Sequence, residues 1–151
     1  MTDKLVWIEN HKQHIELLDK LKFKTSYFYI FAGYPFNDGH RDSILEYCCS
    51  NLKLIDKIQS KGLFEGKSEE AEYYQYIFEI VDYTQRESFF DFLSSFETFF
   101  HRECLFNNDE SYANRCDFGL DDIAFADKNK NVLCHTITHE AMTYINQKAK
   151  L

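Results

Sequence analysis

Proline and glycine are scarce in this chain, which has one proline and five glycines among 151 residues. They leave no room for a low-complexity linker, and no internal repeat is visible, so we expect one globular domain over residues 1–151. No apolar run approaches the ~18 residues that a membrane-spanning helix needs, and the N-terminal stretch MTDKLVWIENHKQH lacks the apolar core of an export signal. We therefore expect a soluble cytoplasmic protein that does not bind membranes.

The cysteines lack the even number and regular spacing of a disulfide framework. There are five, at Cys48, Cys49, Cys104, Cys116 and Cys134, which favours free thiols in a reducing compartment. The sequence also has no G-x-S-x-G, Walker, G-x-G-x-x-G or H-E-x-x-H motif. We expect no cofactor and no enzymatic activity, although missing motifs are weak evidence against catalysis.

Aromatic and acidic residues are what the chain has in excess. Fifteen Phe, ten Tyr and one Trp make up 17% of the sequence, enough to fill a core and leave apolar area for an interface. Lys and Arg number 17 against 25 Asp and Glu, a formal charge of -8. This charge disfavours binding to nucleic acid and favours a basic protein partner.

Hydrophobic spacing predicts helices over residues 9–21, 41–60, 68–83 and 84–105. The last begins with a T-x-x-E capping box, Thr84 to Glu87. In 68–83 the composition YYQYIFEIV favours a strand, but the polar residues recur every three or four positions, and we give this pattern more weight.

Strands are predicted at residues 24–32, as a central strand, and at 122–126, 132–138 and 141–145, with a turn at 33–40. Helices followed by strands, without regular βαβ alternation, indicate an α+β domain. We expect amphipathic helices packed on a small antiparallel sheet that ends in a C-terminal hairpin or meander.

The stretch H-T-I-T-H-E contains the candidate metal ligands His135 and His139. On a strand these residues would lie about 13 Å apart, too far to share one zinc ion. Cys134 and His135 are adjacent, so on a strand they would point to opposite faces and could not form a nucleophilic pair. His11 and His14 are interpreted as surface helix residues, and Cys48 and Cys49 as small buried apolar residues. A small enzyme or metal-dependent domain using His135, His139 and Cys134 remains an alternative.

Carboxylates occur in pairs, some beside aromatic residues, in a mixture that suits contact with a basic protein surface. The candidate partner-binding residues are Asp117, Asp121, Asp122, Asp109, Glu110, Glu69, Glu70, Glu72, Tyr112 and Phe118. The structural alternative is a solvated surface, with Asp121 or Asp122 closing a turn by accepting backbone N–H bonds.

The segment 120–140, L-D-D-I-A-F-A-D-x-x-x-N-V-L-x-x-T-I-T-H-E, lies in a small acidic chain without a catalytic signature. It resembles immunity proteins of bacterial polymorphic-toxin and contact-dependent growth inhibition systems. These proteins have unrelated folds, so the resemblance implies no architecture and no catalytic residues. It implies a role: binding one cognate toxin domain, commonly a basic nuclease, and blocking its active site or substrate surface. We expect a monomer when free; an acidic adaptor or subunit with another basic partner is a further alternative.

Overall fold

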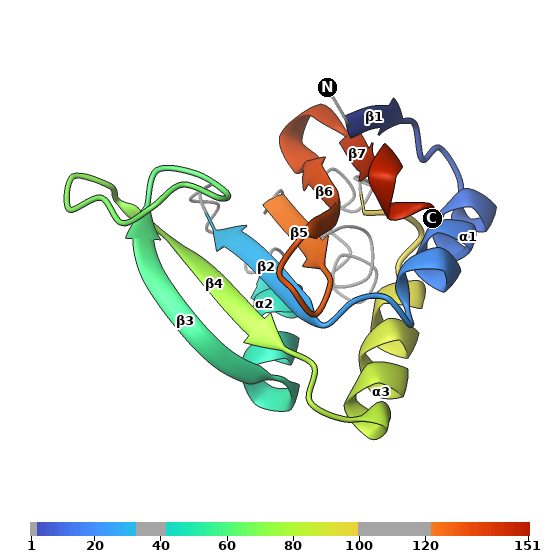
Figure 1. Cartoon of the computed structure of the whole chain (residues 1–151), viewed down its shortest axis with the longest axis horizontal. Helices are drawn as coiled ribbons and strands as arrows, with labels where there is room; N and C mark the ends of the chain where they lie inside the picture. Colours follow the sequence, from blue (N-terminus) through green and yellow to red (C-terminus); the bar gives the residue numbers. More distant parts are fainter. Residues whose placement is uncertain (1–2, 33–41, 100–121) are drawn as a thin grey trace, which may run out of the picture.

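The computed structural model describes residues 3–32, 42–99 and 122–151. In these ranges the chain forms one seven-stranded antiparallel sheet in the order β1-β7-β6-β5-β2-β4-β3 (Figure 1). The strands are β1 (Asp3–Val6), β2 (Tyr27–Ala32), β3 (Lys53–Ser60), β4 (Tyr73–Glu79), β5 (Asp122–Ala126), β6 (Val132–Ile137) and β7 (Met142–Asn146). The helices are α1 (His11–Leu21), α2 (Asp42–Asn51) and α3 (Tyr83–Ser94), with 3-10 turns η1 (Thr138–Glu140) and η2 (Gln147–Ala149).

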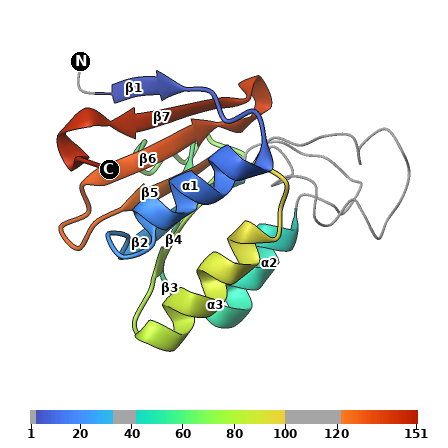
Figure 2. The same ribbon diagram turned by 90° about the vertical axis from the view of Figure 1, so that its right-hand side faces the viewer.

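The three α-helices lie on one face of the sheet, in front of it in Figure 2. Their buried apolar side chains join those of the sheet in a single core cluster, to which α1 contributes Leu21, α2 contributes Ile44 and α3 contributes Phe89. The predicted α+β class is confirmed, with a sheet larger than the small one expected.

Strand β2 is an interior strand, as predicted, and its alternation separates two environments. Phe28 pairs in register with Phe78 of β4 and Phe125 of β5, and all three are fully buried beneath the helices. The Phe28 ring lies 4.9 Å from Phe89 and 5.1 Å from Phe125. Because neighbouring residues on a strand point to opposite faces, Tyr27 and Tyr29 face away from the helices.

The helix predicted over residues 41–60 is wrong in its second half. Helix α2 ends at Asn51, whose side-chain amide donates to the Tyr47 carbonyl, and β3 follows. A β-bulge between Leu54 and Asp56 interrupts the pairing of β3 with β4. The extra residue breaks the two-residue alternation of the strand, which explains why apolar residues here imitate a helical period.

The helix predicted over 68–83 is also wrong, because residues Tyr73–Glu79 form β4. Gln75, counted as a solvent-facing helix position, is buried and accepts a hydrogen bond from the Phe64 amide. Asp82, counted in the same pattern, is the N-cap of α3, where it accepts from the Gln85 amide. Asp82 therefore replaces Thr84 as the cap.

Helix α3 ends at Ser94 rather than continuing through the predicted range, and the part of that range after residue 99 lies outside the described residues. The other predicted elements are confirmed within one to three residues: α1, and the C-terminal meander of β5, β6 and β7. Strand β1, not predicted, pairs with β7 at one edge of the sheet. The predicted turn at 33–40 lies outside the described residues.

Candidate protein-binding surface

The face of the sheet opposite the α-helices carries a line of aromatic side chains. Tyr29 of β2 pairs with Ala124 of β5, Ala124 pairs with His135 of β6, and His135 pairs with Tyr144 of β7. Residues paired in register share a face, so this row crosses four neighbouring strands. We call the surface formed by Tyr27, Tyr29, Phe64, His135 and Tyr144 the aromatic face.

Phe64 reaches the aromatic face from the connection between β3 and β4, residues 61–72. Its ring lies 5.8 Å from that of Tyr29 and 5.6 Å from that of His135. Tyr29 is only 9% exposed beneath it, whereas Phe64 itself is 44% exposed. A large aromatic side chain is thus held against the sheet with nearly half of its surface open to solvent.

The backbone of Phe64 is held in a strained conformation. Its φ of 69° lies in the left-handed region, which costs a non-glycine residue ~1–2 kcal/mol. The hydrogen bond of 2.6 Å from its amide to the Gln75 side chain fixes this conformation. Strained residues concentrate at binding sites, where the surrounding structure must stabilise them. The position of the Phe64 ring is therefore determined by the fold.

His135 lies between two aromatic rings, with Phe64 at one side and Tyr144 stacked 5.2 Å away on the other. Burial lowers the pKa of His135, and nearby Asp3 opposes this shift in part. The neutral imidazole is favoured near pH 7, where it serves as an aromatic packing group.

Cys134 and His135, two residues of the alternative site, do not form a catalytic pair. Cys134 is fully buried on the helix side of β6, and burial raises the pKa of its thiol well above the ordinary range. His135 is on the opposite face, as the alternation predicts. His139 lies in η1, after β6 has ended, so its expected place on the strand is wrong. Among the described residues, no group of three or more His, Cys, Asp or Glu side chains is placed to hold a metal.

Carboxylates are concentrated in the same connection that carries Phe64. The predicted partner-binding residues Glu69, Glu70 and Glu72 are all exposed there, together with Glu65. One of them is paired, since Glu70 lies 3.6 Å from the Lys61 ammonium. Two hydrogen bonds hold this segment against β3. The Ser68 amide donates to the Gln59 carbonyl, and the Gln59 side-chain amide donates to the Ala71 carbonyl. The structure thus places an acidic segment beside an exposed aromatic ring.

Asp122 has a structural role in the described part of the chain. It is the first residue of β5, and its Oδ1 accepts a hydrogen bond of 2.8 Å from the Thr138 amide, which fixes the start of η1. This is the backbone-capping role weighed above as the alternative to partner binding. The other candidates, Asp109, Glu110, Tyr112, Asp117, Phe118 and Asp121, lie outside the described residues.

Two burial predictions for single residues are wrong. Cys49 is exposed, whereas Cys48 is buried as expected, and His14 is not a surface residue. His14 is fully buried between α1 and α3, where its Nε2–H donates to the Leu93 carbonyl at 2.9 Å. Burial lowers its pKa to about 4. His11 is exposed, with Nδ1 3.1 Å from the Glu97 carbonyl oxygen. His14 is buried and bonded to Leu93, whereas His11 is exposed and lies beside Glu97. Their spacing of one helical turn therefore does not create a shared metal or catalytic site.

Sequence reasoning identified part of the acidic segment but missed Phe64 and the aromatic face. The available signal was the run YFYIF in β2, in which tyrosines alternate with residues of the core.

In the described ranges, no helix combines the length and apolar character required to cross a membrane. Comparison of the chain with family models, curated protein sequences and solved structures returns no match.

Proposed function

We propose that the chain is an immunity-type protein that acts in the cytoplasm by binding one basic toxin domain and covering its active site or substrate surface. The observation that carries the proposal is Phe64, which is held half-exposed on a sheet face away from the helices and next to an acidic segment. Aromatic side chains that a partner can fully desolvate are the usual energetic centres of protein interfaces.

The acidic segment supplies the second requirement of such an inhibitor, which is fast and selective encounter. The connection 61–72 contains four glutamates and two lysines, in a chain with a formal charge of -8. A toxin that grips phosphates presents Lys and Arg, so these carboxylates attract the surface that nucleic acid would occupy. Charge then accelerates association, whereas burial of Phe64 and its neighbours slows dissociation.

The aromatic contribution is tested by truncating Phe64 and measuring affinity for a toxin domain encoded beside this protein. We expect Phe64→Ala to weaken binding about 30-fold, equivalent to ~2 kcal/mol, mainly through faster dissociation. The matched control is Trp7→Ala, which removes a 51% exposed ring between β1 and α1. Equal affinity of the two variants, with unchanged melting of both, would exclude the aromatic face.

Salt dependence provides a second measurement that does not require truncation of an aromatic residue. The double variant Glu69→Gln, Glu70→Gln should associate several-fold more slowly at low salt and match the unmodified protein at high salt. Glu16→Gln with Asp19→Asn on the exposed side of α1 removes the same charge elsewhere. If both pairs slow association equally, the effect reflects net charge and the acidic segment is not at the interface.

A further inference from the structure

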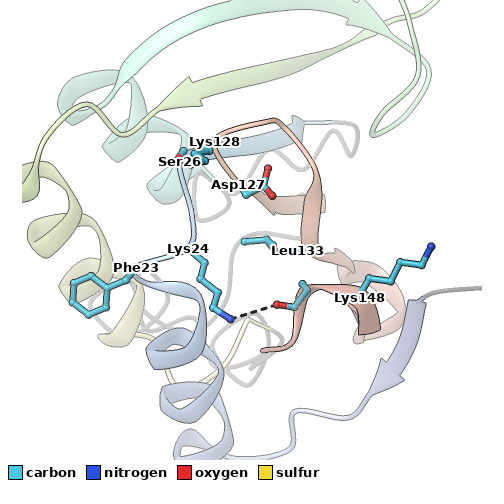
Figure 3. Close-up of a pocket in the computed structure, with 8 residues that line it drawn as sticks. Phe23, Lys24, Ser26, Asp127, Lys128, Leu133 and Lys148 are labelled. Carbon is cyan, nitrogen blue, oxygen red and sulfur yellow. Dashed lines mark hydrogen bonds between the residues drawn. The ribbon is translucent and has the colours of Figure 1, made fainter.

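A groove lies at the end of the sheet where α1, the β5–β6 turn and η2 meet (Figure 3). It consists of two adjoining hollows of about 490 and 410 Å³. Both are bordered by Asp127, Leu133, Lys148 and Ala149, so they form one elongated depression. The apolar part comes from Leu133, Ala149 and Phe23.

The charged rim of the first hollow is basic, unlike the chain as a whole. Lys24, Lys128 and Lys148 line it, and Lys150 follows directly after η2. Among the described residues, none of these four lysines has a carboxylate within ion-pairing distance. Their positive charge is therefore available to an anionic ligand.

Two of the charged groups in the groove are oriented by hydrogen bonds. The Lys24 ammonium donates to the carbonyls of Ala149 and Lys150, at 3.4 and 3.0 Å, which places it across the first hollow (Figure 3). The carboxylate of Asp127 accepts from the amides of Asn129 and Asn131, both at 2.9 Å. These donors partly neutralise the one acidic group in the first hollow, so its potential is dominated by lysine.

We propose that this groove binds a short, extended, acidic segment of a partner polypeptide. The first hollow is open and has a mixed apolar and basic lining, which fits a peptide with carboxylates on either side of an apolar residue. Asp3 and Asp127 line the second hollow, so the acidic residues of the peptide belong in the first. A long polyanion such as nucleic acid would extend beyond the groove onto a chain whose net charge is -8, and this repels it. The inference does not depend on the proposed immunity function, because it involves neither Phe64 nor the acidic segment.

The test uses the whole chain and a fluorescein-labelled peptide of Asp and Glu residues around one central Phe, with anisotropy measured at low salt. The variant Lys128→Glu, Lys148→Glu should bind this peptide at least about tenfold more weakly. Both lysines are exposed, so the fold should be retained, and unchanged circular dichroism checks this. The control Lys12→Glu, Lys57→Glu makes the same charge change at exposed positions outside the groove and the acidic segment, and should stay within about twofold.

Three results would overturn the proposal. The first is absence of peptide binding, or equal weakening in the two double variants. The second is an oligothymidylate that binds more tightly than the peptide and displaces it, which would assign the groove to nucleic acid. The third is self-association of the chain alone in sedimentation, lost in the Lys128→Glu, Lys148→Glu variant, which would assign the groove to a second copy.

Discussion

At the residue scale, His14 shows how a polar group is accommodated in the aromatic core. Its Nε2–H must be the protonated position, because the Leu93 carbonyl can only accept. The ring packs edge-on against Phe99 with centroids 4.6 Å apart, and Nδ1 is buried without a hydrogen-bond partner among the described residues. A proton on Nδ1 would place an uncompensated charge in the core, which is why burial lowers the pKa.

This environment predicts a specific pH dependence of stability. Because the pKa is lowered from 6.5 to about 4 in the folded state, the unfolded chain binds the proton first as pH falls. The stabilisation by neutral His14 is therefore complete above pH 6.5, declines between 6.5 and about 4, and does not decline further below that. The loss is on the order of 3 kcal/mol.

Urea unfolding at several pH values checks this prediction. The variant His14→Met cannot titrate and should show a flatter dependence on pH through that interval, whereas His11→Asn, at the exposed position one turn earlier, should behave like the unmodified protein. Parallel pH profiles for all three proteins would show that His14 is not the titrating group.

At the element scale, one side chain connects α3 to the end of α1. The Arg86 guanidinium donates to the carbonyls of Lys22 and Thr25, just after α1 ends. Lys22 is the C-cap of α1 and Thr25 lies in the connection to β2, so Arg86 supplies donors to two partly buried backbone carbonyls after the helix. The Lys22 ammonium also pairs with Glu87 on α3, at 2.8 Å. Together these bonds fix how the two helices pack.

Replacement of Arg86 by Met should lower the free energy of unfolding by about 1.5–3 kcal/mol, since it removes charge-assisted bonds and leaves two partly buried carbonyls without a donor. Glu87→Gln removes the charge that pairs with Lys22 and weakens the hydrogen bond from Tyr83, both at the helix surface, and should cost less. Chemical denaturation of the three proteins at neutral pH measures both effects. A larger loss for Glu87→Gln would contradict the role assigned to Arg86.

The elements differ in how far local sequence determines them. The apolar stripe of α1 and the short apolar runs of β5 and β6 are local signals, and these elements were predicted, although the N-cap Asn10 was not. Strand β4 depends on pairing with β2, and β3 in turn on pairing with β4. The polar residues of β4 imitate helical spacing because Gln75 faces an amide of the loop rather than solvent. Phe64 belongs to the aromatic face because the connection 61–72 places its ring against Tyr29. Such long-range contacts leave no periodic signal in the sequence.

At the scale of the whole molecule, the sheet separates the described aromatic residues into two environments. Phe28, Phe89 and Phe125 fill the space between the helices and the sheet, whereas Tyr29 and Phe64 pack on the other face. The acidic segment beside Phe64 and the lysines of the groove are then two surfaces of opposite charge. A net charge of -8 therefore does not describe each surface of the molecule.

The shared core predicts that the described elements unfold as one cooperative unit. Phe125 is fully buried and lies within 6.2 Å, between ring centroids, of Phe28, Phe90 and Phe99, so it connects β2, α3 and the residues after α3. Phe125→Ala removes a ring from this packing and should cost about 3–5 kcal/mol, because the cavity cannot close without moving both layers.

Unfolding followed by far-ultraviolet circular dichroism, which reports helix and sheet, and by near-ultraviolet dichroism, which reports aromatic packing, should give coincident transitions before and after this change. Phe23→Ala removes an exposed ring of the same size and should change the free energy of unfolding by no more than ~0.5 kcal/mol. In Phe125→Ala, the aromatic signal could instead be lost at lower denaturant while the far-ultraviolet transition stays in place. This result would show that β4 and β3, the last two strands of the sheet order in Figure 1, do not depend on this core. Coincident shifts would show that the aromatic face and the groove rest on one folding unit, so that core variants would alter both surfaces together.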